Sequence, residues 1–179
     1  MRNVTLLAVL MATVAPLAAH AADGTITFTG NVTDQTCTVS SSGGNATFTV
    51  NLPTVSRTSL AAAGATAGQT PFAINLSQCS AGNVATYFEP GASVDLSSGR
   101  LNNQAASGAG NVQIQLLGDN NQFLPVLAAG TGVAQGNSQW VSVAADGSAN
   151  LNYSAEYYAT GAATAGDVST QVNYTIIYN

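Results

Sequence analysis

The residue types that could carry chemistry are few in this chain. It contains two cysteines, Cys37 and Cys79, which are 42 positions apart, one histidine, His20, and no lysine. Two cysteines with no histidine beside them cannot complete a zinc site. In an exported chain, an even number of cysteines predicts a disulfide, because the compartments outside the cytoplasm are oxidising. We therefore expect Cys37 and Cys79 to be bonded, and we expect no metal site and no cofactor.

The acidic residues offer little for catalysis. Glu89 and Asp95 are six positions apart, and the sequence Pro90-Gly91 between them is typical of a turn, so both read as solvated loop acids. Because lysine is absent and the histidine lies near the N-terminus, a nucleophile and its base would have to come from carboxylates or tyrosines. We expect the protein not to be an enzyme.

The N-terminal residues predict export. Arg2 precedes an apolar stretch from Val4 to Ala15, and Ala19-His20-Ala21 has the small residues of a cleavage site. Residues 1–21 are therefore expected to be a signal peptide, since the alternative, a membrane anchor, needs about 20 apolar residues. The mature chain would keep only Arg57 and Arg100 against eight acidic residues, a balance of 2 − 8 = −6. Such a chain cannot form the cationic surface that nucleic-acid binding requires.

The mature sequence is typical of an all-β protein. Short runs alternate polar and apolar residues and are separated by turn residues, which is the strand pattern. Only Arg57 to Ala63 indicates a helical turn, and about seven strands in this length favour an immunoglobulin-like sandwich. The runs are Thr25–Thr29, Thr47–Leu52, Phe72–Leu76, Val84–Phe88, Val112–Leu116 with a hairpin to Phe123–Val126, Leu151–Tyr157 and Val172–Tyr178.

The two ends of the chain look complementary. By the two-residue period of a strand, one face of the last strand carries Val168, Thr170, Val172, Tyr174, Ile176 and Tyr178. So apolar a strand needs a covering partner, and no later residues could supply one. At the other end, an additional alternating strand carries Ile26, Phe28, Gly30 and Val32. This strand could equally pair within its own domain.

Several segments in order resemble the type 1-type fimbrial subunits of the chaperone–usher pathway. The extension Gly24-Thr25-Ile26-Thr27-Phe28-Thr29-Gly30-Asn31-Val32 precedes Cys37, as in that family. Phe72–Leu76 before Cys79, Asn111–Leu116 and Tyr157–Gly161 resemble its later strands. The C-terminus matches best, with Gly166 fourteenth from the end, Tyr178 penultimate and alternating apolar residues between them.

The resemblance implies an incomplete immunoglobulin-like sandwich that lacks its last strand and is completed by donor-strand exchange. Residues 22–32 would be the donor-strand extension and residues 33–179 the pilin domain. Partners would be identical or related pilus subunits in a homopolymer, a periplasmic chaperone and an outer-membrane usher, with the protein exported through the periplasm to a cell-surface fimbria that supports adhesion. The family implies these site residues: donor residues Ile26, Phe28, Gly30 and Val32; acceptor and chaperone-binding residues Gly166, Val168, Thr170, Val172, Tyr174, Ile176 and Tyr178, with the carboxylate of Asn179 held by the chaperone.

Two other functions remain open from the sequence. One is a monomeric secreted carbohydrate-binding β-sandwich, for which Trp140, Tyr153, Tyr157 and Tyr158 could form an aromatic platform, although core or interface positions suit such residues better. The other is a minor adaptor or tip subunit of the pilus. We favour a major shaft subunit, because the chain offers a donor strand and an acceptor groove and nothing else.

Overall fold

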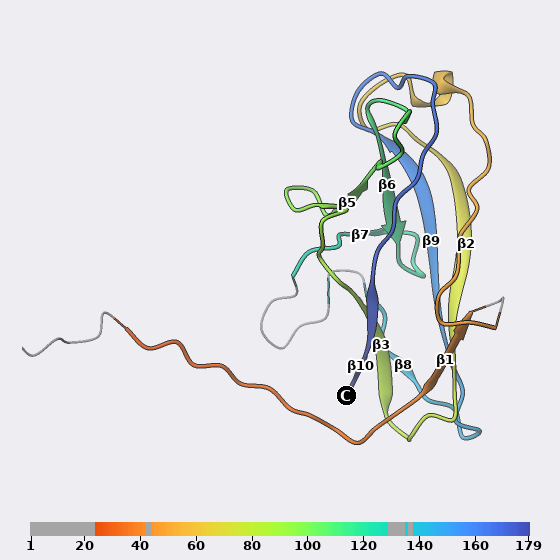
Figure 1. The fold of residues 1–179 in the computed structure, drawn as a ribbon. Helices are drawn as coiled ribbons and strands as arrows, with labels where there is room; N and C mark the ends of the chain where they lie inside the picture. Colours follow the sequence, from red (N-terminus) through yellow and green to blue (C-terminus); the bar gives the residue numbers. More distant parts are fainter. Residues whose placement is uncertain (1–23, 42–43, 129–134, 136–137) are drawn as a thin grey trace, which may run out of the picture. The chain divides into compact units, whose positions relative to one another are not determined.

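The computed structural model describes residues 24–41, 44–128, 135 and 138–179 (Figure 1). The described residues up to Val32 belong to one unit, and Thr33–Asn179 form the other. The predicted signal peptide, residues 1–21, lies outside the described residues. Within those residues no helix is long and apolar enough to cross a membrane.

The larger of the two sheets in Thr33–Asn179 has seven antiparallel strands. In space they run β1-β2-β9-β6-β5-β4, and β7 also pairs with β6. β2 and β9 form the longest pairing, which is interrupted by a register shift between Ala67 and Thr70. The strands are β1 (Thr38–Ser41), β2 (Thr66–Ser77), β4 (Val94–Asp95), β5 (Arg100–Asn102), β6 (Val112–Leu117), β7 (Phe123–Leu124) and β9 (Ala149–Ala159).

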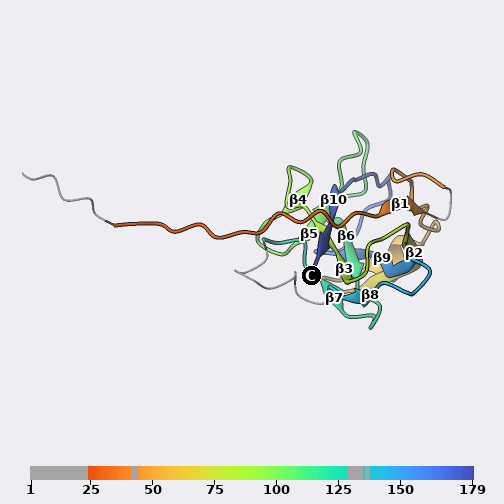
Figure 2. The same cartoon turned by 90° about the horizontal axis from the view of Figure 1, so that it is seen from below.

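The second sheet has three strands in the order β10-β3-β8, namely β10 (Tyr174–Tyr178), β3 (Asn83–Phe88) and β8 (Val141–Ser142). Figure 2 views the domain from below, nearly along the strands, with β10 and β3 of this sheet near the centre. Because three short strands face seven, part of the apolar face of the larger sheet has no strand over it.

The core lies between the sheets. Its most deeply buried side chains come from β2, β3, β7 and β9 and from the loop after β7. Phe88 packs edge-on against Tyr153 with ring centroids 5.1 Å apart. Residues with 0% or 1% exposure include Ile74, Val84, Leu124, Val126 and Leu151. The structure is therefore all-β with an immunoglobulin-like two-sheet arrangement, as the sequence predicts.

Most expected strands are confirmed, two are absent and the last begins two residues later than predicted. Phe72–Leu76, Val84–Phe88, Val112–Leu116 and Leu151–Tyr157 lie within strands, and Leu116 pairs with Leu124 across the predicted hairpin. The predicted helical turn is a 3-10 helix, η1 (Arg57–Leu60), with Ser56 as its N-cap.

The prediction was wrong for Thr25–Thr29 and Thr47–Leu52, which form no strand, and for residues 172 and 173, since β10 begins at Tyr174. The physical reason is shared. A strand needs a continuous hydrogen-bonded neighbour. In the described structure Thr25–Thr29 and Thr47–Leu52 have no backbone partner, and residues 172–173 contribute only the Asn173 carbonyl, which accepts a bond from Glu89 N.

Candidate functional site

An apolar groove of about 1050 Å³ opens on the domain where the larger sheet is left uncovered. Two chain segments form its rims. The first rim is residues 46–52, which follow β1, and the second rim is residues 168–176, which lead into and include part of β10. The floor is contributed by five strands and consists of Phe72, Ile74, Phe88, Leu101, Ile114, Leu116, Ala155 and Tyr157.

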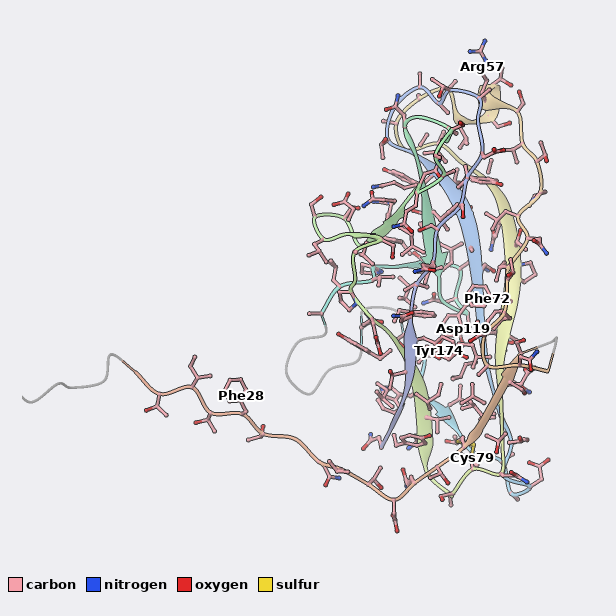
Figure 3. All side chains as sticks on the ribbon, in the orientation of Figure 1. Phe28, Arg57, Phe72, Cys79, Asp119 and Tyr174 are labelled. Atoms are coloured by element: carbon pink, nitrogen blue, oxygen red, sulfur yellow. A yellow bond between two sulfur atoms is a disulfide. The ribbon has the colours of Figure 1, made fainter. Side chains whose placement is uncertain are left out.

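The first rim has the side-chain alternation of a strand but no partner. Phe48, Val50 and Leu52 are half-buried, and Thr47, Thr49 and Asn51 between them are exposed. In the described part of the chain, no backbone–backbone hydrogen bond involves residues 47–52. The ring centroid of Phe48 lies 6.1 Å from that of Phe72, so the side chains pack on the floor while the backbone edge stays free. Figure 3 shows Phe72 and Tyr174, which line the groove.

The second rim is paired along one edge only. The carbonyls of Ser169, Gln171 and Asn173 accept hydrogen bonds of 2.8, 2.6 and 2.8 Å from Gln104 N, Ser93 Oγ and Glu89 N. From residue 174 onward, β10 pairs with β3. Because backbone groups of successive strand residues point to opposite edges, the even-numbered residues direct theirs away from β3, toward the first rim.

The same even-numbered residues direct their side chains inward. Val168, Thr170, Val172, Tyr174 and Ile176 are half-buried and line the groove, whereas the residues between them are exposed up to Thr175. The Tyr174 hydroxyl donates a 2.6 Å hydrogen bond to the Ala46 carbonyl and so links the two rims. Burial of the phenol raises the pKa of Tyr174 above its ordinary value. The Oγ1 atom of Thr170 is buried and has no hydrogen-bond partner in the described structure.

The other predicted acceptor residues lie beyond the groove. Tyr178 and Asn179 continue the pairing with β3, and Asn179 and Asn83 exchange backbone hydrogen bonds of 3.0 and 2.9 Å. Gly166 lies against residues 108 and 109. A Cβ atom there would come within 2.5 Å of the Ala109 nitrogen, so this glycine is needed for close packing of two loops.

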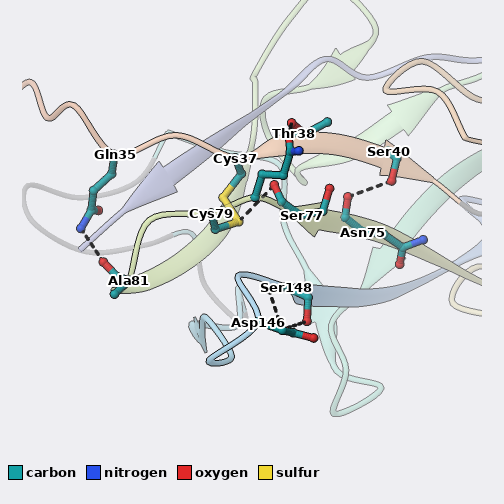
Figure 4. The surroundings of a disulfide bond; sticks show 11 residues. Gln35, Cys37, Thr38, Ser40, Asn75, Ser77, Cys79, Ala81, Asp146 and Ser148 are labelled. Atoms are coloured by element: carbon teal, nitrogen blue, oxygen red, sulfur yellow. Dashed lines mark hydrogen bonds between the residues drawn. A yellow bond between two sulfur atoms is a disulfide. The ribbon is translucent and has the colours of Figure 1, made fainter.

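The two cysteines form the predicted disulfide (Figure 4). It ties the residue before β1 to the turn after β2, at the end of the domain where Gln35 donates a 3.0 Å hydrogen bond from its amide to the Ala81 carbonyl. This link fixes β1 on β2, and the first rim follows directly from β1. The disulfide therefore anchors one side of the groove.

The predicted donor residues lie in the other unit. Residues 24–32 form no strand, and the side chains of Ile26, Phe28 and Val32 are 80%, 88% and 98% exposed. A Cβ atom at Gly30 would meet nothing within 4 Å. Three large apolar side chains are thus exposed within seven residues.

Sequence reasoning missed the first rim and the groove floor as parts of the site. Phe48, Val50 and Leu52 carried a usable signal, because their alternating run follows the first cysteine strand with only a short connection. The floor residues lie in ordinary buried strands, and the sequence holds no indication that the opposite sheet leaves them uncovered.

Comparison with known proteins agrees with this geometry. The family model of the type-1 fimbrial protein FimA matches residues 52–179. The major fimbrial subunit SMF-1 of Stenotrophomonas maltophilia is 70% identical over 170 residues, which cover 94% of this chain and 100% of the relative. A subunit in the structure of a chaperone–usher pilus superposes with a TM-score of 0.59 at 22% identity, covering 92% of this chain and 100% of that one.

The fold is also that of the P pilus rod subunit PapA. The TM-score is 0.58 at 19% identity, over 80% of this chain and 99% of that one. From the family model, the relative and the two folds together, this chain belongs to the type-1 fimbrial protein family and is a structural subunit of a cell-surface fimbria.

Proposed function

We propose that the fimbria grows by donor-strand exchange, with residues 22–32 of one subunit filling the groove of another. The observation that carries this proposal is the pair of free backbone edges facing each other over an apolar floor. A strand laid between residues 47–52 and 168–176 would hydrogen-bond to both rims and cover the floor. Backbone bonds supply affinity in such strand addition, and alternating side chains supply specificity.

Ile26, Phe28 and Val32 would enter the groove on one face of the added strand. They are exposed in the free chain, and burial of each large apolar side chain contributes about 1.5–3 kcal/mol. Gly30, on the same face, would suit a position where the strand approaches the floor closely. The acceptor residues would be the groove-lining set from Val168 to Ile176, with Gly166 supporting the loop at one end.

An empty groove is a hazard before assembly, because it exposes apolar surface beside unpaired strand edges. We therefore assign the subunit a periplasmic chaperone that occupies the groove first, with basic residues that hold the carboxylate of Asn179, and an outer-membrane usher at which exchange occurs. The similarity to a chaperone–usher pilus subunit supports this route of export through the periplasm. Similarity to a major fimbrial subunit supports a major, non-enzymatic shaft role that serves adhesion.

The structure gives no support to a carbohydrate-binding platform. Tyr153 is 2% exposed and belongs to the core, and the ring of Tyr158 lies 3.6 Å from the guanidinium carbon of Arg100. Trp140 is exposed, whereas Tyr157 lines the groove floor.

A self-complemented chain tests the proposal. Residues 22–31 are removed, and a copy of residues 23–33 is appended after Asn179 through a flexible Gly/Ser linker long enough to span the groove. Because the added strand is now intramolecular, its effective concentration reaches about millimolar. We expect a monomer that is far more stable to heat than the unfilled subunit and does not polymerise, as measured by calorimetry and light scattering.

The matched control carries Phe28→Asp in the appended copy only. It keeps the linker and the strand but places a charge in an apolar groove, which costs several kcal/mol unless the charge finds a partner. Equal thermal stability of the two chains, or aggregation of the first, would show that residues 26–32 do not fill the groove.

A further inference from the structure

The two arginines of the described chain have opposite environments. The guanidinium carbon of Arg100 lies 3.6 Å from the ring centroid of Tyr158 and 4.4 Å from that of Phe123, and its Nε donates a 3.0 Å hydrogen bond to Gln115. Arg57 is exposed and makes no side-chain hydrogen bond or ion pair with any described residue. Among the described side chains, Arg57 is thus the one cation available to another molecule.

Arg57 lies at one end of the domain, which we call the arginine end. It begins η1, whose Leu60 carbonyl accepts a 3.0 Å hydrogen bond from Ala163, beyond the end of β9. Figure 3 shows Arg57 at the top of the domain and Cys79 at the bottom. The bottom, around the Cys37–Cys79 bond, is the disulfide end.

Asp146 is held in position at the disulfide end. Cys79 N donates a 2.9 Å hydrogen bond to the Gly147 carbonyl, which places the turn before β9 beside the disulfide (Figure 4). The Oδ1 atom of Asp146 accepts bonds of 3.0 and 2.7 Å from the nitrogen and Oγ of Ser148. These bonds fix the carboxylate and leave Oδ2 directed to no described residue.

Arg57 and Asp146 cannot attract each other within one subunit. They lie at opposite ends of β9, whose 11 residues span about 35 Å. Charges in water are screened over about 8 Å at physiological salt. Each subunit therefore presents one unpaired positive end and one fixed negative end.

The direction of the donated strand decides which ends meet. The second rim runs from Gly166, packed at the arginine end on residue 109, to Asn179, paired at the disulfide end with Asn83. Each domain begins at Thr33, close to Gln35 at its own disulfide end. A donated strand antiparallel to the rim places the donor's disulfide end on the acceptor's arginine end. With a parallel strand, the disulfide end of each subunit would meet the disulfide ends of both the subunit before it and the subunit after it. Its arginine end would then meet neither neighbour, which a linear fibre of stacked subunits does not permit.

We propose that Arg57 of one subunit pairs with Asp146 of the subunit whose strand it accepts, and that this contact orients successive subunits along the fimbria. The partner is a second copy of this chain, and the inference rests on the donor-strand function proposed above. The head-to-tail arrangement is heterologous, so one contact of this kind forms at every junction and the chain of subunits stays open. Because the mature subunits all carry net negative charge, an attractive contact at the junction also offsets repulsion between neighbours.

Charge reversal tests the contact in cells that assemble the full-length chain. Arg57→Glu alone and Asp146→Arg alone each place like charges at every junction. We expect the association constant of the junction to fall by about fivefold, the factor for loss of an exposed ion pair, and fimbriae in electron micrographs to be shorter than those of the wild type. Co-expression of the two single variants allows opposite charges at every junction when the variants alternate. We expect the mixture, and the double variant, to restore wild-type length.

The matched control is Asp119→Arg, which makes the same charge change in the exposed turn between β6 and β7, away from both ends. It should not rescue Arg57→Glu. Rescue by Asp119→Arg, or rescue by Asp34→Arg but not by Asp146→Arg, would overturn the pairing. So would normal length in both single variants, and in that case the persistence of fimbriae would leave the donor-strand function intact, since its own test is the self-complemented chain.

Discussion

β6 and the first rim have similar sequences and opposite environments. β6 pairs with β9 on one edge and with β5 and β7 on the other, and all six of its residues are buried. Residues 47–52 alternate as strictly, yet their apolar side chains are only half-buried, the others are exposed, and the segment carries no backbone pairing in the described structure. The comparison shows that an alternating run predicts a segment able to form a strand but does not say which strand pairs with it. For β6 the chain itself supplies the pairing strands, and for the rim we propose that another subunit does.

The largest expected effect concerns the bond that anchors the rim. Replacing Cys37 and Cys79 with serine removes the closure of a loop with a sequence separation of 42. The chain-entropy model assigns such a loop about 4 kcal/mol of stability. Urea unfolding of the self-complemented chain should show that loss, and a thiol assay on the native protein should find no free cysteine. Free thiols in the exported protein would contradict the pairing.

The second prediction contrasts the two regions directly. Leu151, which is 0% exposed and pairs with Ile74, belongs to the completed part of the core. Leu151→Ala should cost about 3 kcal/mol whether or not the groove is filled, because the cavity forms in either state. For Val50→Ala, on the rim, the loss of unfolding free energy in the unfilled subunit should be less than half of the loss in the self-complemented chain. An equal loss of unfolding free energy for Val50→Ala in the unfilled and self-complemented chains would contradict the claim that the rim is completed only when the groove is filled.

The third prediction concerns Gly166, which the family pattern places in the assembly signature. Gly166→Ala should cost about 2 kcal/mol even in the self-complemented chain, because the added Cβ meets the backbone of residues 108 and 109. Gly161→Ala is the control, since its Cβ would find ordinary contacts of 3.4 Å or more with Asn111. Calorimetry of both variants checks this. A stability loss restricted to chaperone-bound subunits would instead favour a direct role in capture.

The smallest expected effect is on pH dependence, at the edge of the larger sheet. Hydrogen bonds from Ser97, Gln113 and Ser98 hold the pKa of Asp95 well below its usual range. A lowered folded-state pKa means that the stabilisation is present above the ordinary carboxyl pKa of about 3.9 and is lost as the pH falls below it. Asp95→Asn should therefore lower stability slightly at pH 7, where the ionised carboxylate of the wild type is fully stabilising, and should flatten the acid limb between about pH 4 and 2, where the wild type loses that contribution. An unchanged acid limb would contradict it.

The sequence predicted the strands that pair within the chain better than those that do not. Phe72–Leu76 and Val84–Phe88 were found because alternation, flanking turns and burial all agree there. Thr47–Leu52 has the same alternation, but strand formation depends on a neighbour that local pattern cannot locate. The inward face formed by the even-numbered residues of 168–176 could be predicted from the two-residue period alone. The side chains keep this alternation even where the hydrogen bonds to neighbouring strands are incomplete.

Other parts of the site depend on distances that the sequence does not contain. The packing of Gly166 against residue 109 and the link from Tyr174 to Ala46 join segments separated by 57 and 128 positions. The disulfide was predictable because two cysteines in an exported chain allow one pairing. The distance between Arg57 and Asp146 could not be predicted from the sequence, because it depends on how β9 runs from one end of the domain to the other.

Amide hydrogen exchange on assembled fimbriae tests the central claim most directly. In the unfilled subunit, the amides of residues 47–52 and those of Thr170 and Val172 should exchange rapidly, because no backbone acceptor faces them. In the fimbria, we predict protection of alternate amides along both rims, together with alternate amides of residues 25–32, at a level near that of β6. Rims that exchange equally fast before and after assembly, with β6 protected in both, would show that no strand fills the groove.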